Sequence, residues 1–512
     1  MRLGPLWFSS AVIAGVLAAS AAIAAAQPVT LTATVHFDRT IRPGERINKN
    51  LLGLVNGVNS AILPGVDKVV QKDIRPPFIR ADVGFEDSGC PDNPNAGPLY
   101  NPTDNSFNYC TVDQRIEQAL AVHARPLMII DYMPPPLGVP ACVASNGNGF
   151  GNHICPPADH AKFSALVEAM MVHVYRKFKA RDFEVWNEPD LPIFFDGQLS
   201  DYLAIYEDCN AALLAAEKQL HLRRGTLHLG GPATFIDDQN FIEGVMADAV
   251  SNPDLRVDFI SWHYYANYLA LTGQDPSLAA DIYGDLTRQV QGYIAPYLAE
   301  RTDLHPKLWI DEWNVNSFYD PRMSTAYDGA FEVAAMHSMQ DAGLDRSCRY
   351  NTADGSANSA TTGNFGIFTF DDGARPVLYG IEMWRDLAPR RVEVEATGDT
   401  DLSHYTQNLI ASIGPHAATV LIYNFIPYSP LDQSAPYCGD GGAELDATLT
   451  LTGLKNGAHK VTMRQFDCST GILPIAEATL TPTSSTLNFS GHQAALPVTV
   501  PADGAILITI AR

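Results

Sequence analysis

The chain has 512 residues, enough for two or three domains, and its apolar fraction of 46% is ordinary for globular proteins with large cores. Its formal net charge of −23 at pH 7 argues against nucleic acid or an anionic membrane as a partner, because both require a basic protein surface. The composition fits a soluble protein that binds a neutral or cationic ligand.

The first residues have the layout of a secretory signal peptide. Arg2 precedes an apolar stretch that runs to about Ile23, and three alanines lead to Gln27. We expect cleavage after Ala26, so that residues 1–26 are a signal peptide rather than a membrane anchor. No later segment is long and apolar enough to span a bilayer. The sequence therefore predicts a secreted or periplasmic protein with no membrane association after signal removal.

The eight cysteines fit an oxidising compartment, although eight cysteines alone do not fix a connectivity. Plausible short-range pairs are Cys90–Cys110, Cys142–Cys155 and Cys438–Cys468, which leaves Cys209 and Cys348 as candidate free thiols of the core. An alternative metal site at His153, Cys155 and His160 matches no zinc spacing pattern, and we predict no metal.

Between residues 46 and 390, short apolar runs alternate with longer amphipathic segments. The predicted strands are residues 51–55, 78–82, 126–131, 183–188, 227–232, 257–263, 308–314 and 346–351. The predicted helices are residues 116–124, 158–179, 199–220, 241–249, 279–300, 326–342 and 376–387. Eight strands that alternate with helices predict an α/β fold, a (β/α)8 TIM barrel with a parallel sheet.

The pattern changes at about residue 391. Short alternating runs separated by Gly, Pro, Asn and Ser predict a C-terminal β-sandwich domain over residues 391–512; they are residues 409–413, 418–426, 447–451, 461–466, 479–480, 498–500 and 505–510. A lone alternating segment, residues 29–37, precedes the barrel. We expect residues 27–45 to join the sandwich as an N-terminal strand, and residues 46–390 to form the barrel.

Two of the predicted barrel strands end in a glutamate. The fourth runs into Trp186-Asn187-Glu188-Pro189, and the seventh carries Ile310-Asp311-Glu312-Trp313. A single glutamate after an apolar run is usually structural. However, active sites of these barrels lie at the carboxyl ends of the strands, and paired carboxylates are the machinery of glycoside hydrolysis. Asn187 can bind a sugar hydroxyl, and Pro189 rigidifies the turn that aims the glutamate.

These motifs resemble the clan A glycoside hydrolases, most closely glycoside hydrolase family 39, the β-xylosidase and α-L-iduronidase group. The resemblance implies that Glu188 is the catalytic acid/base and Glu312 the catalytic nucleophile. It covers most of residues 50–390, and the family also carries a β-sandwich. No organic cofactor is implied.

Further positions match the family pattern. Phe78-Ile79-Arg80 resembles its second strand, whose Arg lies near the nucleophile, and residues 259–265 resemble its sixth-strand His-x-Tyr motif. Tyr350 stands where the family often has Trp. Where the family commonly has a His-Gly turn, Arg80 is followed by Ala81 and Asp82, at a loop that borders the sugar subsite. The predicted substrate-binding residues are Arg80, Asp82, Asn187, His263, Tyr265, Trp313 and Tyr350.

The sequence thus predicts a secreted, retaining glycoside hydrolase that cleaves O-glycosidic bonds of an oligosaccharide, polysaccharide or other glycoside, β-xylosidase-like or a related pentosidase. Two alternatives stay open. One is a carbohydrate-binding protein without turnover on the same scaffold, and the other is a transglycosylase that differs only in the acceptor.

Overall fold

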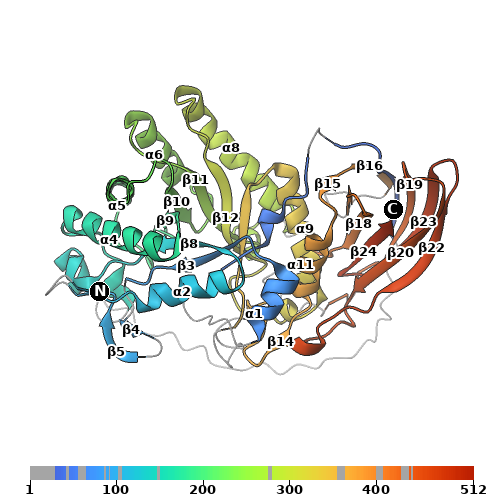
Figure 1. Cartoon of the computed structure of the whole chain (residues 1–512), viewed down its shortest axis with the longest axis horizontal. Coiled ribbons are helices and arrows are strands. Elements are labelled where there is room, and N and C mark those ends of the chain that lie inside the picture. Colours follow the sequence, from blue (N-terminus) through green and yellow to red (C-terminus); the bar gives the residue numbers. More distant parts are fainter. Residues whose placement is uncertain are drawn as a thin grey trace, which may run out of the picture.

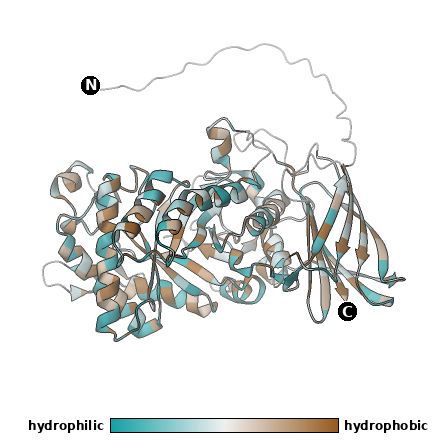
Figure 2. Ribbon diagram, turned by 90° about the horizontal axis from the view of Figure 1, so that it is seen from above, coloured by the Kyte–Doolittle hydropathy of each residue, from teal (hydrophilic) through white to brown (hydrophobic). Residues whose placement is uncertain are grey.

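The computed structural model describes residues 29–41, 45–55, 65–85, 88–90, 93–101, 106–146, 150–274, 279–354, 364–398, 408–427, 438–439 and 442–512. The predicted signal peptide, residues 1–26, lies outside the described residues. A barrel wrapped by helices occupies one end of the long axis, and two β-sheets occupy the other (Figure 1). Figure 2 shows the same division from above.

Eight parallel strands close the barrel in the order β10-β11-β12-β13-β2-β3-β8-β9. Each corresponds to a predicted strand: β2 (Gly53–Val55), β3 (Phe78–Asp82), β8 (Arg125–Ile130), β9 (Asp182–Val185), β10 (His228–Thr234), β11 (Phe259–Tyr265), β12 (Lys307–Asn314) and β13 (Arg346–Tyr350). The structure therefore confirms the predicted fold class. Neighbouring parallel strands need a crossover connection, and the helices between successive strands provide it.

Helices surround the barrel, with α4, α5, α6 and α8 outside the strands in Figure 1. They are α1 (Val66–Val69), α2 (Cys110–Ala121), α3 (Pro140–Asn146), α4 (His160–Phe178), α5 (Leu199–Gln219), α6 (Gln239–Ser251), α7 (Asn267–Leu271), α8 (Ile282–Glu300), α9 (Ala326–Ala342) and α11 (Val377–Asp386). The N-termini of two helices are capped by single polar side chains. The Asp159 side chain accepts a hydrogen bond from the backbone N–H of Lys162 at the start of α4, and the Thr325 side chain accepts one from the backbone N–H of Tyr327 at the start of α9.

Two small hairpins after β3 were not predicted. They pair β4 (Ser88–Cys90) with β5 (Asn93–Pro98), and β6 (Tyr100–Asn101) with β7 (Ser106–Phe107). Helix α2 follows them and begins at Cys110 rather than near Ile116. Its first turn has no apolar periodicity that sequence reasoning could use. The hairpins extend the loop that leaves β3, the strand of Arg80, at the carboxyl face of the barrel.

The C-terminal part of the chain, together with one strand from its N-terminal part, forms two sheets with a common core. One has the order β16 (Glu393–Gly398), β1 (Val29–His36), β19 (Leu445–Thr452) and β23 (Gln493–Val500). The other has the order β15 (Arg390–Arg391), β17 (Leu409–Ile413), β18 (Ala417–Asn424), β24 (Gly504–Ala511), β20 (Gly457–Phe466) and β22 (Thr483–Phe489). Strand β1 pairs antiparallel with β16 and parallel with β19. The early segment thus lies in a sheet with strands more than 350 residues away.

The expected strand at residues 479–480 is wrong. Thr479 and Leu480 lie outside any strand, and the neighbouring strand is β22, which runs along the edge of the six-stranded sheet beside β20. Most side chains of β22 are exposed. A strand at a sheet edge with few buried positions lacks the apolar alternation on which the prediction relied. A further small pairing joins β14 (Gly373–Ala374) to β21 (Leu473–Pro474), so the sandwich also contacts the barrel.

Helix α9 lies between the barrel and the six-stranded sheet. Nearly all of its side chains are buried, because one side of the helix packs on the barrel and the other side packs on the six-stranded sheet. Phe331 of α9 contacts both Trp313 of the barrel and Phe425 of the sandwich, with ring centroids 6.2 and 5.6 Å apart. The His337 Nδ1 atom lies 3.0 Å from the Tyr423 hydroxyl. The two domains therefore share one continuous core.

The three predicted disulfides are confirmed: Cys90–Cys110, Cys142–Cys155 and Cys438–Cys468. Cys209 and Cys348 are buried free thiols. Because Cys155 is oxidised, it cannot act as a thiolate ligand in the alternative metal site considered above. Across the described residues, the longer helices are too polar to cross a membrane.

Candidate active site

The barrel interior changes from apolar to polar toward the carboxyl ends of its strands. Near the other end, Trp309 stacks on Phe259 and contacts Phe78, with ring centroids 4.4 and 5.3 Å apart. Side-chain direction repeats every two residues along a strand, so the next inward positions on two of these strands are Arg80 and Ser261. A polar site therefore lies on an aromatic floor, at the barrel face where catalytic groups gather.

A bulge in β12 shapes this site. Trp262 of β11 pairs with Ile310, but the next residue, His263, pairs with Glu312, so that Asp311 is an extra residue in β12. Such an insertion re-aims side chains next to the irregularity. As a result, both Asp311 and Glu312 approach the Arg80 guanidinium inside the barrel, at 3.7 and 3.0 Å.

Glu312 receives two strong hydrogen-bond donors. Arg80 Nη1 donates to Oε2 across 3.0 Å, and the Tyr265 hydroxyl donates to Oε1 across 2.7 Å. Burial raises the pKa of Glu312, whereas the Arg80 charge and the Tyr265 hydrogen bond lower it. Both donors favour the ionised carboxylate that a nucleophile requires.

Glu188 has different surroundings. Its Oε1 lies 2.8 Å from Nδ1 of His263, and burial lowers the pKa of that imidazole well below its usual value, so His263 is neutral. Burial and the nearby charge of Glu312 raise the pKa of Glu188 well above the ordinary range for a carboxyl group. Both Trp186 and Glu188 have positive φ angles, 68° and 48°, a sparsely populated conformation that often marks functional loops.

The two glutamates face each other across one site. A carboxyl oxygen of Glu188, a ring nitrogen of His263 and a carboxyl oxygen of Glu312 all lie within 4.8 Å of one another. Glu312 accepts a hydrogen bond from a cation, whereas the side chain that hydrogen-bonds to Glu188 in the described part of the chain is a neutral imidazole. When the pair holds a single proton, that proton therefore belongs on Glu188.

Arg80 is the centre of the hydrogen-bond network. Its side chain is buried, and Nη2 donates a hydrogen bond to Oδ1 of Asn187 across 3.0 Å, in addition to the bond from Nη1 to Glu312. Nε donates to Oε2 of Glu184 across 2.6 Å. Asn187 in turn donates to the Tyr132 hydroxyl. Each nitrogen of the guanidinium is thus engaged by the protein.

A family model described as "Glycosyl hydrolases family 39" matches residues 100–470, well over half of the chain. The chain belongs to this family. The match includes both glutamate motifs and most of the sandwich, and it confirms the family that the sequence motifs resemble.

Individual relatives agree with this membership. The chain is 27% identical over 345 residues to a β-xylosidase of Caldicellulosiruptor saccharolyticus, covering 64% of this chain and 66% of that protein. It is 27% identical over 169 residues to a β-xylosidase of Geobacillus stearothermophilus, covering 31% of each. The chain therefore spans slightly less than two thirds of the first relative and about a third of the second.

Solved structures share the whole fold. A monomeric β-xylosidase from Caulobacter crescentus CB15 superposes with a TM-score of 0.70 at 14% identity, covering 94% of this chain and 99% of that one. A family 39 enzyme from Xanthomonas axonopodis pv. citri gives a TM-score of 0.70 at 16% identity, covering 97% and 99%. At these identities the likeness concerns the fold, and both barrel and sandwich take part in it.

The structure brings most of the predicted site residues of this family 39 chain together. Arg80, Asn187, His263 and Tyr265 contact the glutamate pair or each other, as described above. Asp82 lies close enough that its charge raises the pKa of Glu312. Tyr350 is also close to the pair: burial is the main cause that raises its pKa, and the charge of Glu312 adds to it. Tyr350 keeps part of its surface exposed.

The expectation for Trp313 is wrong. Its side chain is fully buried and packs edge-on against Tyr283 of α8, with ring centroids 5.2 Å apart. After the bulge at Asp311, Glu312 points into the barrel and the next residue points outward to the helices. Trp313 therefore belongs to the core between barrel and helices, where it cannot stack on a sugar.

Three residues of the site were missed by sequence reasoning: Glu184, Ser261 and Asp311. Glu184 accepts from Arg80 and from the Ser261 hydroxyl, each at 2.6 Å. Strand parity could have found Glu184 and Ser261, because Glu184 precedes Glu188 by four positions and Ser261 precedes His263 by two. Asp311 could not be placed this way, since strict alternation from Glu312 turns the preceding residue outward, and only the bulge lets both residues face inward.

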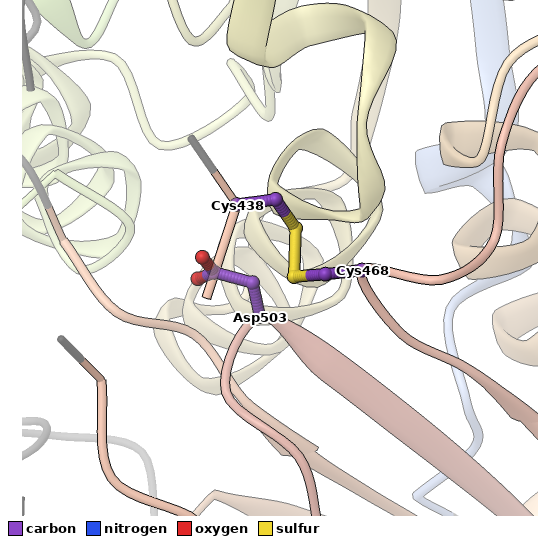
Figure 3. Close-up of side chains that lie close together, drawn as sticks. All are labelled: Cys438, Cys468 and Asp503. Atoms are coloured by element: carbon purple, nitrogen blue, oxygen red, sulfur yellow. A yellow bond between two sulfur atoms is a disulfide. The ribbon is translucent and has the colours of Figure 1, made fainter. Parts of the chain in front are cut away.

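Neither group of potential metal ligands in the described residues has a free donor set. In the site, both Glu312 oxygens are used by Arg80 and Tyr265, and the Arg80 charge opposes a cation. In the sandwich, Asp503 lies beside the Cys438–Cys468 disulfide (Figure 3). Its oxygens accept from the backbone N–H groups of Ile426 and Gly439, and the sulfurs are oxidised. Neither group fits a metal ion.

Proposed function

We propose that this family 39 chain is a retaining glycoside hydrolase in which Glu188 is the acid/base and Glu312 the nucleophile. The observation that carries the proposal is the approach of one oxygen of each glutamate to within 4.8 Å. Retaining enzymes hold their two carboxyl groups about 5–5.5 Å apart, whereas inverting enzymes need about 6.5–9.5 Å to admit a water molecule. The short separation supports direct attack by one carboxylate.

The contacts assign the roles within this mechanism. Glu188, whose proton is retained by burial and by repulsion from Glu312, protonates the glycosidic oxygen as the bond to the anomeric carbon breaks. The Glu312 carboxylate, held by Arg80 and Tyr265, forms a bond to that carbon. Glu188, now ionised, removes a proton from the water that releases the sugar from Glu312.

The substrate that we propose is a neutral pentoside, such as a β-xyloside, rather than a uronide. A uronate carboxylate would meet Asp82, Glu188 and Glu312, while the Arg80 nitrogens already bind protein oxygens. The segments of the barrel loops outside the described residues offer no further cation: residues 56–64, 86–87, 91–92, 102–105, 147–149, 275–278 and 355–363 contain neither Lys nor Arg. The named β-xylosidase relatives support the same choice.

A panel of aryl glycosides tests this function. We expect the purified protein to hydrolyse an aryl β-xyloside and to act at least about 100-fold more slowly on the matching uronides, because an uncompensated buried charge costs about 3–5 kcal/mol. NMR of the first-formed product is expected to show the retained anomer. An inverted anomer would exclude the mechanism, and sugar binding without turnover would favour a carbohydrate-binding protein.

We further propose that the protein is secreted or periplasmic. Three disulfides support an oxidising compartment, and the N-terminal sequence supports export. N-terminal sequencing of the mature protein from the culture medium or periplasm is expected to begin at Gln27. A mature protein that starts at Met1 would contradict this.

A further inference from the structure

A second pair of carboxyl groups lies beneath Glu312. The side chains of Glu184 on β9 and Asp311 on β12 are fully buried, and the mechanism above uses neither. Glu184 accepts hydrogen bonds from Arg80 and Ser261. In contrast, among the described residues no side chain donates a hydrogen bond to either oxygen of Asp311. Asp311 is thus a buried acid without the donors that an ionised carboxylate requires.

The charges around Asp311 point the same way. Arg80 is the only cation among the described side chains that contacts this cluster, and Glu184 and Glu312 already bind it at 2.6 and 3.0 Å. The Arg80 Nε atom is 3.7 Å from Asp311, too far for a hydrogen bond. A third ionised carboxylate would leave two uncompensated negative charges in the barrel interior, which is strongly unfavourable.

The remaining neighbours do not supply a positive charge. On β11, Nε2 of His263 lies 3.7 Å from Oδ1 of Asp311, and burial lowers the pKa of that imidazole, so it is neutral. On β13, burial raises the pKa of the Cys348 thiol, so it also stays neutral. Among the described side chains, the groups within 4 Å of the Asp311 carboxyl that could carry a positive charge are thus Arg80 and the neutral His263, since Arg346 of β13 lies over the Phe78 and Trp309 rings instead.

We propose that Asp311 is a neutral carboxylic acid in the resting enzyme and donates a hydrogen bond to Glu184, which leaves the charge of Arg80 for Glu312. Burial and the adjacent charge of Glu184 raise the pKa of Asp311 well above the usual range, and hydrogen bonding between the two carboxyl groups stabilises the protonated form. Asp311 is a positioning residue: it acts on Glu312 through Glu184 and Arg80. The inference rests on the function proposed above.

The role has a chemical consequence. The Asp311 proton fixes Glu184, Glu184 orients the guanidinium through Nε, and Nη1 of the same guanidinium then points at the nucleophile. If Asp311 lost its proton, a new negative charge next to Glu312 would raise the proton affinity of both Glu312 and Glu188. Ionisation of Asp311 would therefore shift the whole pH profile upward and weaken the hold of Arg80 on the nucleophile.

The pH profile of Asp311→Asn tests the proposal, because the Asn amide can donate to Glu184 as the acid does but cannot ionise. We expect both limbs of the kcat/KM pH profile of Asp311→Asn to stay at their wild-type pH values, because the substitution removes no charge from a neutral acid. A shift of both limbs to lower pH would overturn the proposal, because it would mean that the substitution had removed a negative charge. Glu184→Gln, which removes the anion that orients Arg80, is expected to lower kcat/KM by about 100-fold. An unchanged kcat/KM would count against the proposal.

Infrared difference spectroscopy tests the proton directly and does not depend on activity. The difference between wild type and Asp311→Asn is expected to contain the C=O stretch of a protonated carboxylic acid, shifted in D2O; its absence would overturn the proposal. In Glu184→Gln, Asp311 becomes the anion beside Arg80, so the band is expected to vanish, and this variant serves if Asp311→Asn does not fold. A band in an inactive protein would refute the proposed function alone, whereas activity without a band would refute the role of Asp311 alone.

Discussion

Tyr265 and Glu312 lie on neighbouring strands, and the phenol of one donates to Oε1 of the other across 2.7 Å. This bond stabilises the ionised form of the glutamate more than the protonated form, because a carboxylate is the stronger acceptor. It therefore helps to set the pH below which the nucleophile is lost.

Replacing Tyr265 with Phe is expected to raise the pKa of Glu312 and move the acid limb of kcat/KM to higher pH by about one unit, since a hydrogen bond to a charged group contributes about 1.5–3 kcal/mol. The pH dependence of aryl glycoside hydrolysis measures this. Tyr264→Phe is the matched control, because that side chain lies on the same strand but packs in the outer core. A limb that stays in place in Tyr265→Phe would contradict the assignment.

Glu312→Gln is expected to lower kcat by about 10⁴-fold or more, the range seen when a nucleophile is removed. The amide cannot form a glycosyl ester. Incubation of the wild-type protein with an activated 2-fluoro glycoside, followed by peptide mass spectrometry, is expected to find the sugar on Glu312. A label on any other carboxyl group would assign the nucleophile elsewhere.

Glu188→Ala is expected to slow substrates with poor leaving groups most, because good leaving groups depart without protonation. Azide, which needs no general base, is expected to restore part of the turnover and to yield a glycosyl azide. In the wild-type protein, the raised pKa of Glu188 means that activity falls as the pH rises through that value and the proton is lost. A rate loss that is equal for all leaving groups would argue against this role.

The sequence was sufficient for the strand order of the barrel because each strand is a short apolar run between helices, and βαβ connections leave few topologies. It also placed Glu188 and Glu312, whose neighbours form motifs. It could not show that Asp311 faces inward beside Glu312, because a bulge is invisible to a period of two. The outward direction of Trp313 does follow from that period, since this residue comes directly after Glu312. Nor could it find β22, an edge strand whose exposed residues carry no apolar pattern.

Buried carboxyl groups outside the site make stability depend on pH. Burial raises the pKa of Glu382 on α11 to about 7. Its folded value is above the unfolded one, so its contribution is complete below about pH 4.3 and is lost as the pH rises toward 7. Glu382→Gln is therefore expected to gain a few degrees of Tm relative to wild type between about pH 4.5 and 7.5. Calorimetry measures this, and the exposed Glu477→Gln is expected to show no such trend.

The last prediction concerns Asp82, which ends β3 two positions after Arg80. Its charge raises the pKa of Glu312, so it lies close to the reacting groups, and its backbone oxygen accepts from Arg115. We propose that its carboxylate binds a sugar hydroxyl. A site built to bind a hydroxyl discriminates against sugars that lack it.

Asp82→Ala is therefore expected to change the ratio of kcat/KM between aryl xylosides, arabinosides and glucosides by about tenfold or more. It is also expected to move the acid limb to lower pH, because removal of a negative charge lowers the pKa of Glu312. Asp82→Asn is the matched control, since it removes the charge but keeps an acceptor: it is expected to shift the limb and to preserve more of the sugar preference. Equal loss on every sugar would mean that Asp82 acts on Glu312 alone.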